Sequence, residues 1–179
     1  MSGQRQNKSL SIREITIFSM LGAIMFLSKL VMEFLPNIHL MGTLVAVYTL
    51  VYRKKALVPI YVCVFLIGVY GGFDLWWMPY LYIWTILWGA IMLIPKSIGK
   101  RTKYIIYPII TAMHGLLFGI LYAPAQALLF KLDFQSTIAW IIAGIRFDVI
   151  HCIGNLVLGF LIPDLTALLI KLSKKARII

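Results

Sequence analysis

The stretch FDLWWMPYLYIWTILWG, residues 73–89, decides the class of this fold, because it is mostly apolar and contains most of the chain's tryptophans. It holds four of the five tryptophans, two tyrosines and one acid. Two interpretations fit this pattern: a belt of aromatic side chains at a membrane–water boundary, or the wall of a binding site. The composition of the whole chain has to say first whether there is a membrane.

The composition is that of a membrane protein. The 179 residues are 61% hydrophobic and 13% charged, with a mean hydropathy of +0.93. Soluble domains are roughly 45–50% apolar and about 25% charged, and several apolar runs in this chain approach the ~20 residues that span a bilayer. We therefore expect an all-α polytopic membrane protein. Cys63 and Cys152 lie in apolar runs and form no CxxC pattern, so they predict neither a metal site nor a disulfide.

Charge clusters and turn residues divide the chain into six predicted transmembrane helices: residues 15–34, 39–52, 56–70, 79–94, 104–130 and 137–162. The second and third are short for full spans, and a short amphipathic tail follows the sixth. The expected organisation is a cytoplasmic N-terminal segment (1–14), a six-helix membrane domain (15–172) and a basic cytoplasmic tail (173–179).

The basic residues predict the orientation. Fourteen of the 17 lysines and arginines fall in four segments that six spans would place on one side: residues 5–13, 53–55, 96–103 and 171–177. The opposite loops hold only Lys131. By the positive-inside rule both termini are expected to be cytoplasmic. Basic loops beside anionic lipid also account for the net charge of +11 without nucleic acid.

Several polar residues interrupt the apolar runs. Lys29 and Glu33 are four residues apart and share a helix face; they either neutralise each other near the outer interface or contact a ligand. The last predicted span carries a stripe with helical spacing, made of Thr137, Trp140, Gly144, Asp148, His151, Asn155 and Gly159. Such a stripe must face protein or a cavity, so interhelical hydrogen bonding and a ligand site are the two alternatives.

The aromatic residues of the opening stretch form a ladder. Trp77, Tyr80, Trp84 and Trp88 follow at steps of 3, 4 and 4, on one helix face. An aromatic belt is one layer thick, whereas Trp88 would lie ~16 Å below Trp77. The ladder therefore suits a wall of flat surfaces that stack on a planar ring or a cation, with lipid-facing packing as the alternative.

Small residues predict close helix approach. Gly115, Gly119, Ala123 and Ala127 repeat every four residues in the fifth predicted span. The first span carries Ser19 and Ala23, also four apart, with Gly22 beside Ala23. The patch from Ser19 to Ala23 is either a docking surface for a partner membrane subunit or part of the internal packing.

This pattern resembles the S components of energy-coupling factor (ECF) transporters, which are small six-helix membrane proteins that capture vitamins or related micronutrients. The resemblance covers about residues 15–172 and rests on size, six spans, both termini inside and the small-residue patch. Ser19–xxx–Ala23 is similar to the family's Ala-xxx-Ala docking signature, with serine in the first place. Three stretches also resemble members of this group: LPNIHLMGTLVAVYTLVYRKKALVPIYV (35–62), WWMPYLYIWTILWG (76–89) and LYAPAQALLF (121–130).

The resemblance implies a multi-pass protein of a prokaryotic plasma membrane that binds its substrate near the outer surface, under loops 35–40 and 71–78. Its partners would be a membrane coupling subunit and two cytoplasmic ATPases, with release of the substrate after the subunit topples in the bilayer. No cofactor, metal or catalytic residue is expected, and the absence of a Walker motif means that the chain is not expected to hydrolyse ATP.

The ladder, the polar stripe and these loops together predict a hollow in the outer half of the bundle, where aromatic rings hold a ligand with a planar ring. Thiamine-like, pyrimidine-like and benzimidazole-like ligands all suit it. The expected substrate-binding residues are Asn37, Asp74, Trp77, Tyr80, Trp84, Gln126, Asp148, His151, Lys29 and Glu33.

Other classes of function also remain as alternatives. A stand-alone secondary transporter would favour internal repeats, and none is evident. An intramembrane enzyme could use Asp148 and His151 as an acid–base pair, but His39, His114 and His151 are far apart in sequence and lack a metal-binding spacing. A structural subunit would bind no small molecule.

Overall fold

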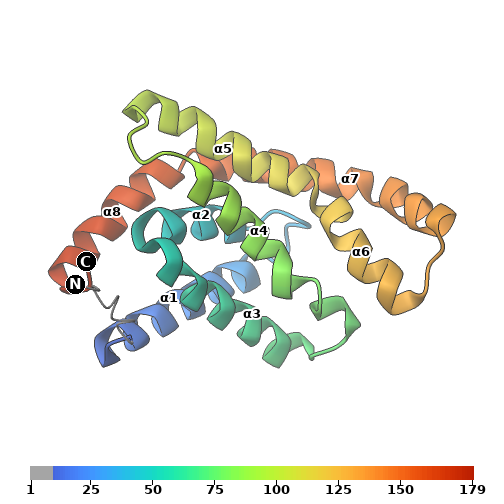
Figure 1. Ribbon diagram of the computed structural model, residues 1–179, viewed down its shortest axis with the longest axis horizontal. Helices are drawn as coiled ribbons and strands as arrows, with labels where there is room; N and C mark the ends of the chain where they lie inside the picture. The colour runs from blue at the N-terminus through green and yellow to red at the C-terminus, as the bar shows by residue number, and fades with distance from the viewer. Residues whose placement is uncertain (1–9) are drawn as a thin grey trace, which may run out of the picture.

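The computed structural model describes residues 10–179, and these residues form only helices and their connections (Figure 1). Arg5 and Lys8, which belong to the predicted cytoplasmic N-terminal segment, lie outside the described residues. The described helices are, in chain order, α1 (Ile12–Val31), α2 (Met41–Tyr52), the 3-10 helix η1 (Arg53–Ala56), α3 (Leu57–Gly71), the 3-10 helix η2 (Leu75–Trp77), α4 (Tyr80–Leu93), α5 (Lys100–Leu116), α6 (Phe118–Phe130), α7 (Phe134–Gly159) and α8 (Ile162–Lys175).

Every predicted span corresponds to a helix, and the predicted amphipathic tail forms α8. Four segments are long and apolar enough to cross a membrane: Ile12–Val31, Leu75–Leu93, Lys100–Phe130 and Phe134–Gly159. The helices α2 and α3 have 12 and 15 residues, fewer than the ~20 that a full crossing needs. The protein is therefore a helical multi-pass membrane protein with four candidate spans. Each of the six predicted spans is helical, but only four segments are long and apolar enough to cross a membrane.

The predicted span 104–130 is a single rod with a bend. Its two parts, α5 and α6, meet at Leu117, whose backbone leaves the helical region at φ −90° and ψ 2°. The hydrogen-bond ladder is interrupted at the bend: the Leu117 N–H still donates to Met113 O (2.9 Å) and the Leu121 N–H to Leu117 O (2.8 Å), but the Gly119 N–H donates to the Asp148 carboxylate of α7. The bend directs α6 away from the axis of α5 while α7 runs beside both (Figure 1).

The short helix α2 lies at the centre of the bundle. Nine of its 12 residues are buried, as expected for a helix that is apolar on all sides. Two helix pairs flank it, α1 with α3 and α5 with α7, and it also packs against α4 and α8 (Figure 1). A helix that protein surrounds on all sides has no lipid-facing surface, which is consistent with its short length.

The contact between α5–α6 and α7 depends on glycine. A methyl group at Gly119 would lie 2.4 Å from Asp148 Oδ2, and one at Gly115 would lie 2.9 Å from Asn155 Nδ2. One at Gly159 of α7 would lie 2.6 Å from the Cα atom of Pro108. These distances confirm that the small residues of the fifth predicted span allow close helix approach.

The basic segments gather at one end of the molecule. The Arg13 guanidinium of α1 donates to Ala176 O (3.4 Å) after α8, and Lys55 of η1 forms an ion pair with Glu14 of α1. Arg53 of η1 donates to Met92 O (3.1 Å) near the end of α4. In Figure 1 the start of α1, the α4–α5 loop and α8 accordingly share the left-hand end.

Candidate functional site

The aromatic ladder of α4 faces the interior of the bundle. Trp84 is only 1% exposed, and Trp77, Tyr80 and Trp88 pack against the same core. The Trp77 indole N–H donates to Val64 O (2.8 Å), and that of Trp88 donates to Arg53 O (3.0 Å). Lipid-facing packing of the ladder is therefore wrong. Trp76, which is 37% exposed, is the tryptophan of this stretch with a large accessible surface.

The bundle brings the chain's three histidines to the ladder. The ring centroid of His39 lies 5.0 Å from that of His151 and 6.3 Å from that of Trp84, and the His114 centroid lies 5.6 Å from that of Trp84. Phe118 closes the group, with its centroid 5.0 Å from that of His151 and 6.0 Å from that of Trp84. We call these five rings the histidine–indole cluster.

Three different elements supply the histidines, which is why their sequence spacing carried no signal. His39 lies in the turn before α2, His114 in the last turn of α5, and His151 two-thirds of the way along α7. Gly115 and Gly154 let these segments approach, because a methyl group there would lie 3.0 Å from the His151 carbonyl carbon and 3.1 Å from Ile38 Cγ1 respectively.

Polar atoms in and around the cluster are buried without partners. Within residues 10–179, the atoms without a partner there are His39 Nδ1, His114 Nδ1, His151 Nε2, Trp84 Nε1 and, one helical turn from His151, Asn155 Oδ1. Buried polar groups in proteins are nearly always hydrogen-bonded, because a buried group without a partner costs about 1–3 kcal/mol. This set of donors and acceptors could satisfy the polar edge of a small molecule or a few water molecules.

From Asp148 to Gly159 the polar stripe of α7 faces α5 and α6, as the sequence predicts for a stripe that meets protein. Asp148, His151, Asn155 and Gly159 are all buried. Interhelical hydrogen bonding accounts for two of them. Asp148 accepts from the Gly119 N–H (3.1 Å to Oδ1), and Asn155 Nδ2 donates to Thr111 O (3.0 Å). Near the N-terminal end of the stripe, Trp140 stacks on Tyr122 of α6 with ring centroids 5.7 Å apart.

Asp148 consequently has a structural role. Gly119 is the second residue of α6, and its N–H belongs to the first turn of that helix, where backbone donors lack partners within the helix. A carboxylate placed there supplies an acceptor and complements the positive end of the helix dipole. His151, Trp84 and Tyr80 lie in or beside the cluster, whereas Asp148 holds α6 to α7.

Five other predicted binding residues take no part in the ring contacts or hydrogen bonds of the cluster: Asn37, Asp74, Gln126, Lys29 and Glu33. Asp74 is exposed and accepts from the N–H of Leu75 (2.6 Å), at the start of η2. Asn37 adopts a positive φ of 59° in the turn before α2. Lys29 and Glu33 do not form an ion pair within the described residues, so the structure does not show mutual neutralisation, one of the two alternatives for this pair.

The small residues of α1 differ in exposure: Gly22 is buried, whereas Ser19 is accessible. Gly22 is buried against α3, where a methyl group would lie 2.6 Å from Val62 Cβ and 2.8 Å from Pro59 O. Internal packing, one of the two alternatives from the sequence, therefore explains Gly22. Ser19 is exposed and Ala23 is half-buried, which leaves Ser19 on an accessible face of the helix.

Two pockets of the bundle lie away from the histidine–indole cluster. One of about 400 Å³ lies at the basic end, and one of about 350 Å³ lies between α1 and α8. The predicted hollow at the ladder is thus not among them. Within residues 10–179, no group of three or more histidine, cysteine or acidic side chains is arranged to hold a metal ion.

Comparison with known proteins adds no assignment: no protein-family model, no curated protein and no solved structure matches this chain.

Proposed function

We propose that this protein is the substrate-capture subunit of an ECF-type importer, which binds a small ligand with a planar ring inside the bundle and passes it to a membrane coupling subunit driven by two ATPases. In this proposal the basic end faces the cytoplasm, both termini are cytoplasmic, and the protein lies in the plasma membrane of a prokaryote. Loops 35–40 and 71–78 then lie on the outer side.

One observation carries the proposal: the histidine–indole cluster combines flat aromatic surfaces with buried polar atoms that lack partners. Small-ligand sites are typically apolar and aromatic, with a few placed polar groups. A planar nitrogen-containing ring could stack on Trp84 or Phe118 and exchange hydrogen bonds with His39 and His151. His39 belongs to loop 35–40, so opening of that loop would expose the cluster from the outer side.

The first test is ligand binding by the purified full-length protein. Thiamine, hydroxymethylpyrimidine and dimethylbenzimidazole serve as probes for the three ligand types, with intrinsic tryptophan fluorescence as the readout. We expect one of them to quench the fluorescence in a saturable manner. Trp84→Phe keeps an aromatic ring but removes the unpartnered indole N–H, so it should weaken binding by roughly tenfold, the cost of about one hydrogen bond.

Trp140→Phe is the matched control, because Trp140 stacks on Tyr122 outside the cluster. This variant should bind as the parent does. Native mass spectrometry of the untreated protein provides a second readout, since a retained non-lipid molecule would reveal a ligand outside the probe set. If no probe binds and no small molecule is retained, or if both tryptophan variants lose binding equally, the interior cluster is not a ligand site.

The transport step needs its own test. In cells that express a coupling subunit and two ATPases, uptake of the bound probe should require this chain together with all three partners. Uptake by this chain alone would instead assign it to stand-alone secondary transporters.

A further inference from the structure

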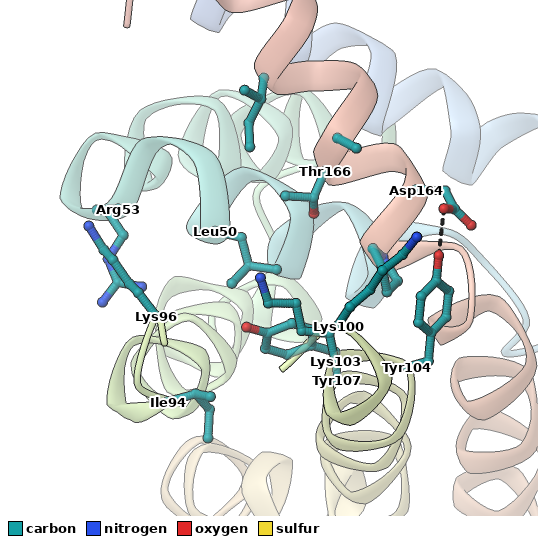
Figure 2. Close-up of a pocket in the computed structure, with 13 residues that line it drawn as sticks. Leu50, Arg53, Ile94, Lys96, Lys100, Lys103, Tyr104, Tyr107, Asp164 and Thr166 are labelled. Atoms are coloured by element: carbon teal, nitrogen blue, oxygen red, sulfur yellow. Dashed lines mark hydrogen bonds between the residues drawn. The ribbon is translucent and has the colours of Figure 1, made fainter. Parts of the chain in front are cut away.

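The pocket at the basic end combines cations with an apolar floor. It has a volume of about 400 Å³ and lies between η1, the α4–α5 loop, the start of α5 and α8. Arg53, Lys96, Lys100 and Lys103 line it, together with one carboxylate, Asp164. Figure 2 shows Arg53 and Lys96 grouped on one side, while Lys100 and Lys103 extend from α5 toward the middle of the pocket.

These cations lack an anionic partner. The one ion pair found within residues 10–179 joins Lys55 to Glu14, so none of the four is neutralised by a carboxylate within 4.0 Å. Asp164, the acid of the pocket, instead accepts a hydrogen bond from the Tyr104 hydroxyl (2.6 Å; Figure 2). Like charges that share a pocket repel each other, so a bound anion would stabilise this arrangement.

The first turn of α5 adds to the positive potential. Gly99 precedes it and offers no side-chain acceptor, and the turn contains no acid. Its unpaired N–H groups form the positive end of the helix dipole, which disfavours cations and favours anions. Lys100 and Lys103 nevertheless occupy this turn. Stability of the helix alone would favour acids here, and the lysines therefore add to the positive potential of the helix end rather than offsetting it.

Two hydrogen bonds hold Arg53 in a strained backbone conformation. Its φ of 54° is unusual for a residue other than glycine, so its backbone is strained. The Trp88 indole N–H donates to its carbonyl (3.0 Å), and its guanidinium donates to Met92 O (3.1 Å). These two bonds fix the residue at the edge of the pocket, with further guanidinium donors left for a ligand.

The other lining residues suit an ester rather than a bare ion. Leu50, Ile94 and Ile170 provide apolar surface, and the buried Tyr107 also lines the pocket. The Thr166 hydroxyl oxygen is buried at the pocket without a hydrogen-bond partner, so it remains available to a ligand oxygen. This lining favours a ligand whose anionic head contacts the cations and whose apolar tail lies on the apolar floor of the pocket.

We propose that this pocket binds the phosphate group of an organic phosphate ester. Two sources share this chemistry: the headgroup of an anionic phospholipid, for which basic pockets between helices are known sites, and a soluble phosphate ester from the cytoplasm. The proposal does not depend on the ligand of the histidine–indole cluster, because the two sites share no residue.

The experiment uses the full-length protein in neutral detergent. Native mass spectrometry compares retention of phosphatidylglycerol with that of phosphatidylcholine, and the melting temperature is measured with added pyrophosphate or glycerol phosphate. The test variant is Lys100→Gln/Lys103→Gln. It should lose affinity by roughly tenfold or more, because charge-assisted hydrogen bonds are among the stronger ones.

Lys54→Gln/Arg101→Gln is the matched control. Lys54 and Arg101 are exposed neighbours of pocket cations but do not line the pocket, and the double variant removes the same charge. It should bind within about twofold of the parent, because exposed charges at a distance are screened. Melting without any probe, measured for both variants, separates loss of binding from loss of fold.

Preferential retention of phosphatidylglycerol that the test variant alone abolishes identifies a lipid headgroup. Stabilisation by glycerol phosphate that the test variant alone abolishes identifies a soluble ester. The proposal is overturned if neither probe binds, or if the test and control variants lose binding to the same extent, since that would be a general effect of net charge.

Discussion

At the scale of single residues, the contact between Gly119 and Asp148 decides how α6 joins the bundle. A methyl group at residue 119 would lie 2.4 Å from Asp148 Oδ2. Gly119→Ala therefore forces the carboxylate away from the backbone N–H of residue 119, which donates a hydrogen bond to it. We expect Gly119→Ala to lower the free energy of unfolding by about 1–3 kcal/mol, as for other overpacked sites. The measurement is thermal unfolding of the detergent-purified protein.

Gly144→Ala is the control for this prediction, because nothing lies within 4 Å of a methyl group there. It should leave stability unchanged or raise it by up to about 1 kcal/mol, the helix-propensity gain of alanine. Asp148→Ala removes the clash together with the hydrogen bond, so its effect and that of Gly119→Ala should not add. Full additivity in the double variant would mean that the two residues do not interact.

At the scale of elements, α7 begins at a titratable cap. The Asp133 carboxylate accepts from the Ser136 N–H (2.7 Å). Hydrogen bonds from the Ser136 side chain and backbone lower the pKa of Asp133 below its usual 3.8. Because the folded-state pKa is the lower one, this cap stabilises the helix above the unfolded pKa, and the contribution is lost as the pH falls through the folded pKa.

Asp133→Ala should therefore lower the melting temperature at neutral pH, and the difference from the parent should shrink as the pH falls below about 4. Asp133→Asn retains an acceptor without a titrating group, and asparagine caps helices about as well as aspartate. This second variant should stay close to the parent at neutral pH. A difference between parent and Asp133→Ala that is independent of pH would show that the ionised cap contributes nothing.

The elements themselves were largely predictable from the sequence. Charge clusters at 53–55 and 96–103 mark helix ends, and the glycines of the fifth predicted span anticipate its contact with α7. The inward orientation of Trp84 could only be stated as one of two alternatives, because a helix in lipid can bury apolar residues on any face.

The composition of the site was less predictable. His39 and His114 meet the ladder only because the segment before α2 and the helix α5 pack against α4, and nothing in the local sequence reports such a meeting. The sequence predicts Asp148 as a ligand contact, because a buried acid in a membrane helix is by default a site hypothesis. The structural role of Asp148 follows from the bend at Leu117, which the sequence does not predict. The bend starts a new helix, α6, whose first-turn N–H groups need an acceptor.

At the scale of the whole molecule, the proposed transport cycle requires a face of α1 that meets another subunit. Ser19 lies on an exposed part of α1, while Gly22 packs against Val62 of α3. We expect Ser19→Trp to abolish uptake by the assembled transporter and to leave ligand binding and melting temperature unchanged, since the bulky ring would only obstruct the docking surface.

Gly22→Ala is the informative companion. Its methyl group would lie 2.6 Å from Val62 Cβ, so it should lower the melting temperature and reduce binding together with uptake. Uptake assays, fluorescence titration and thermal unfolding on the same preparations separate the two cases. Ser19 and Gly22 are three residues apart and therefore neighbours on the helix surface. Opposite outcomes would place the boundary between the assembly surface and the packed surface of α1 between them. Loss of ligand binding in Ser19→Trp would instead place Ser19 with the internal packing and remove α1 from the proposed interface.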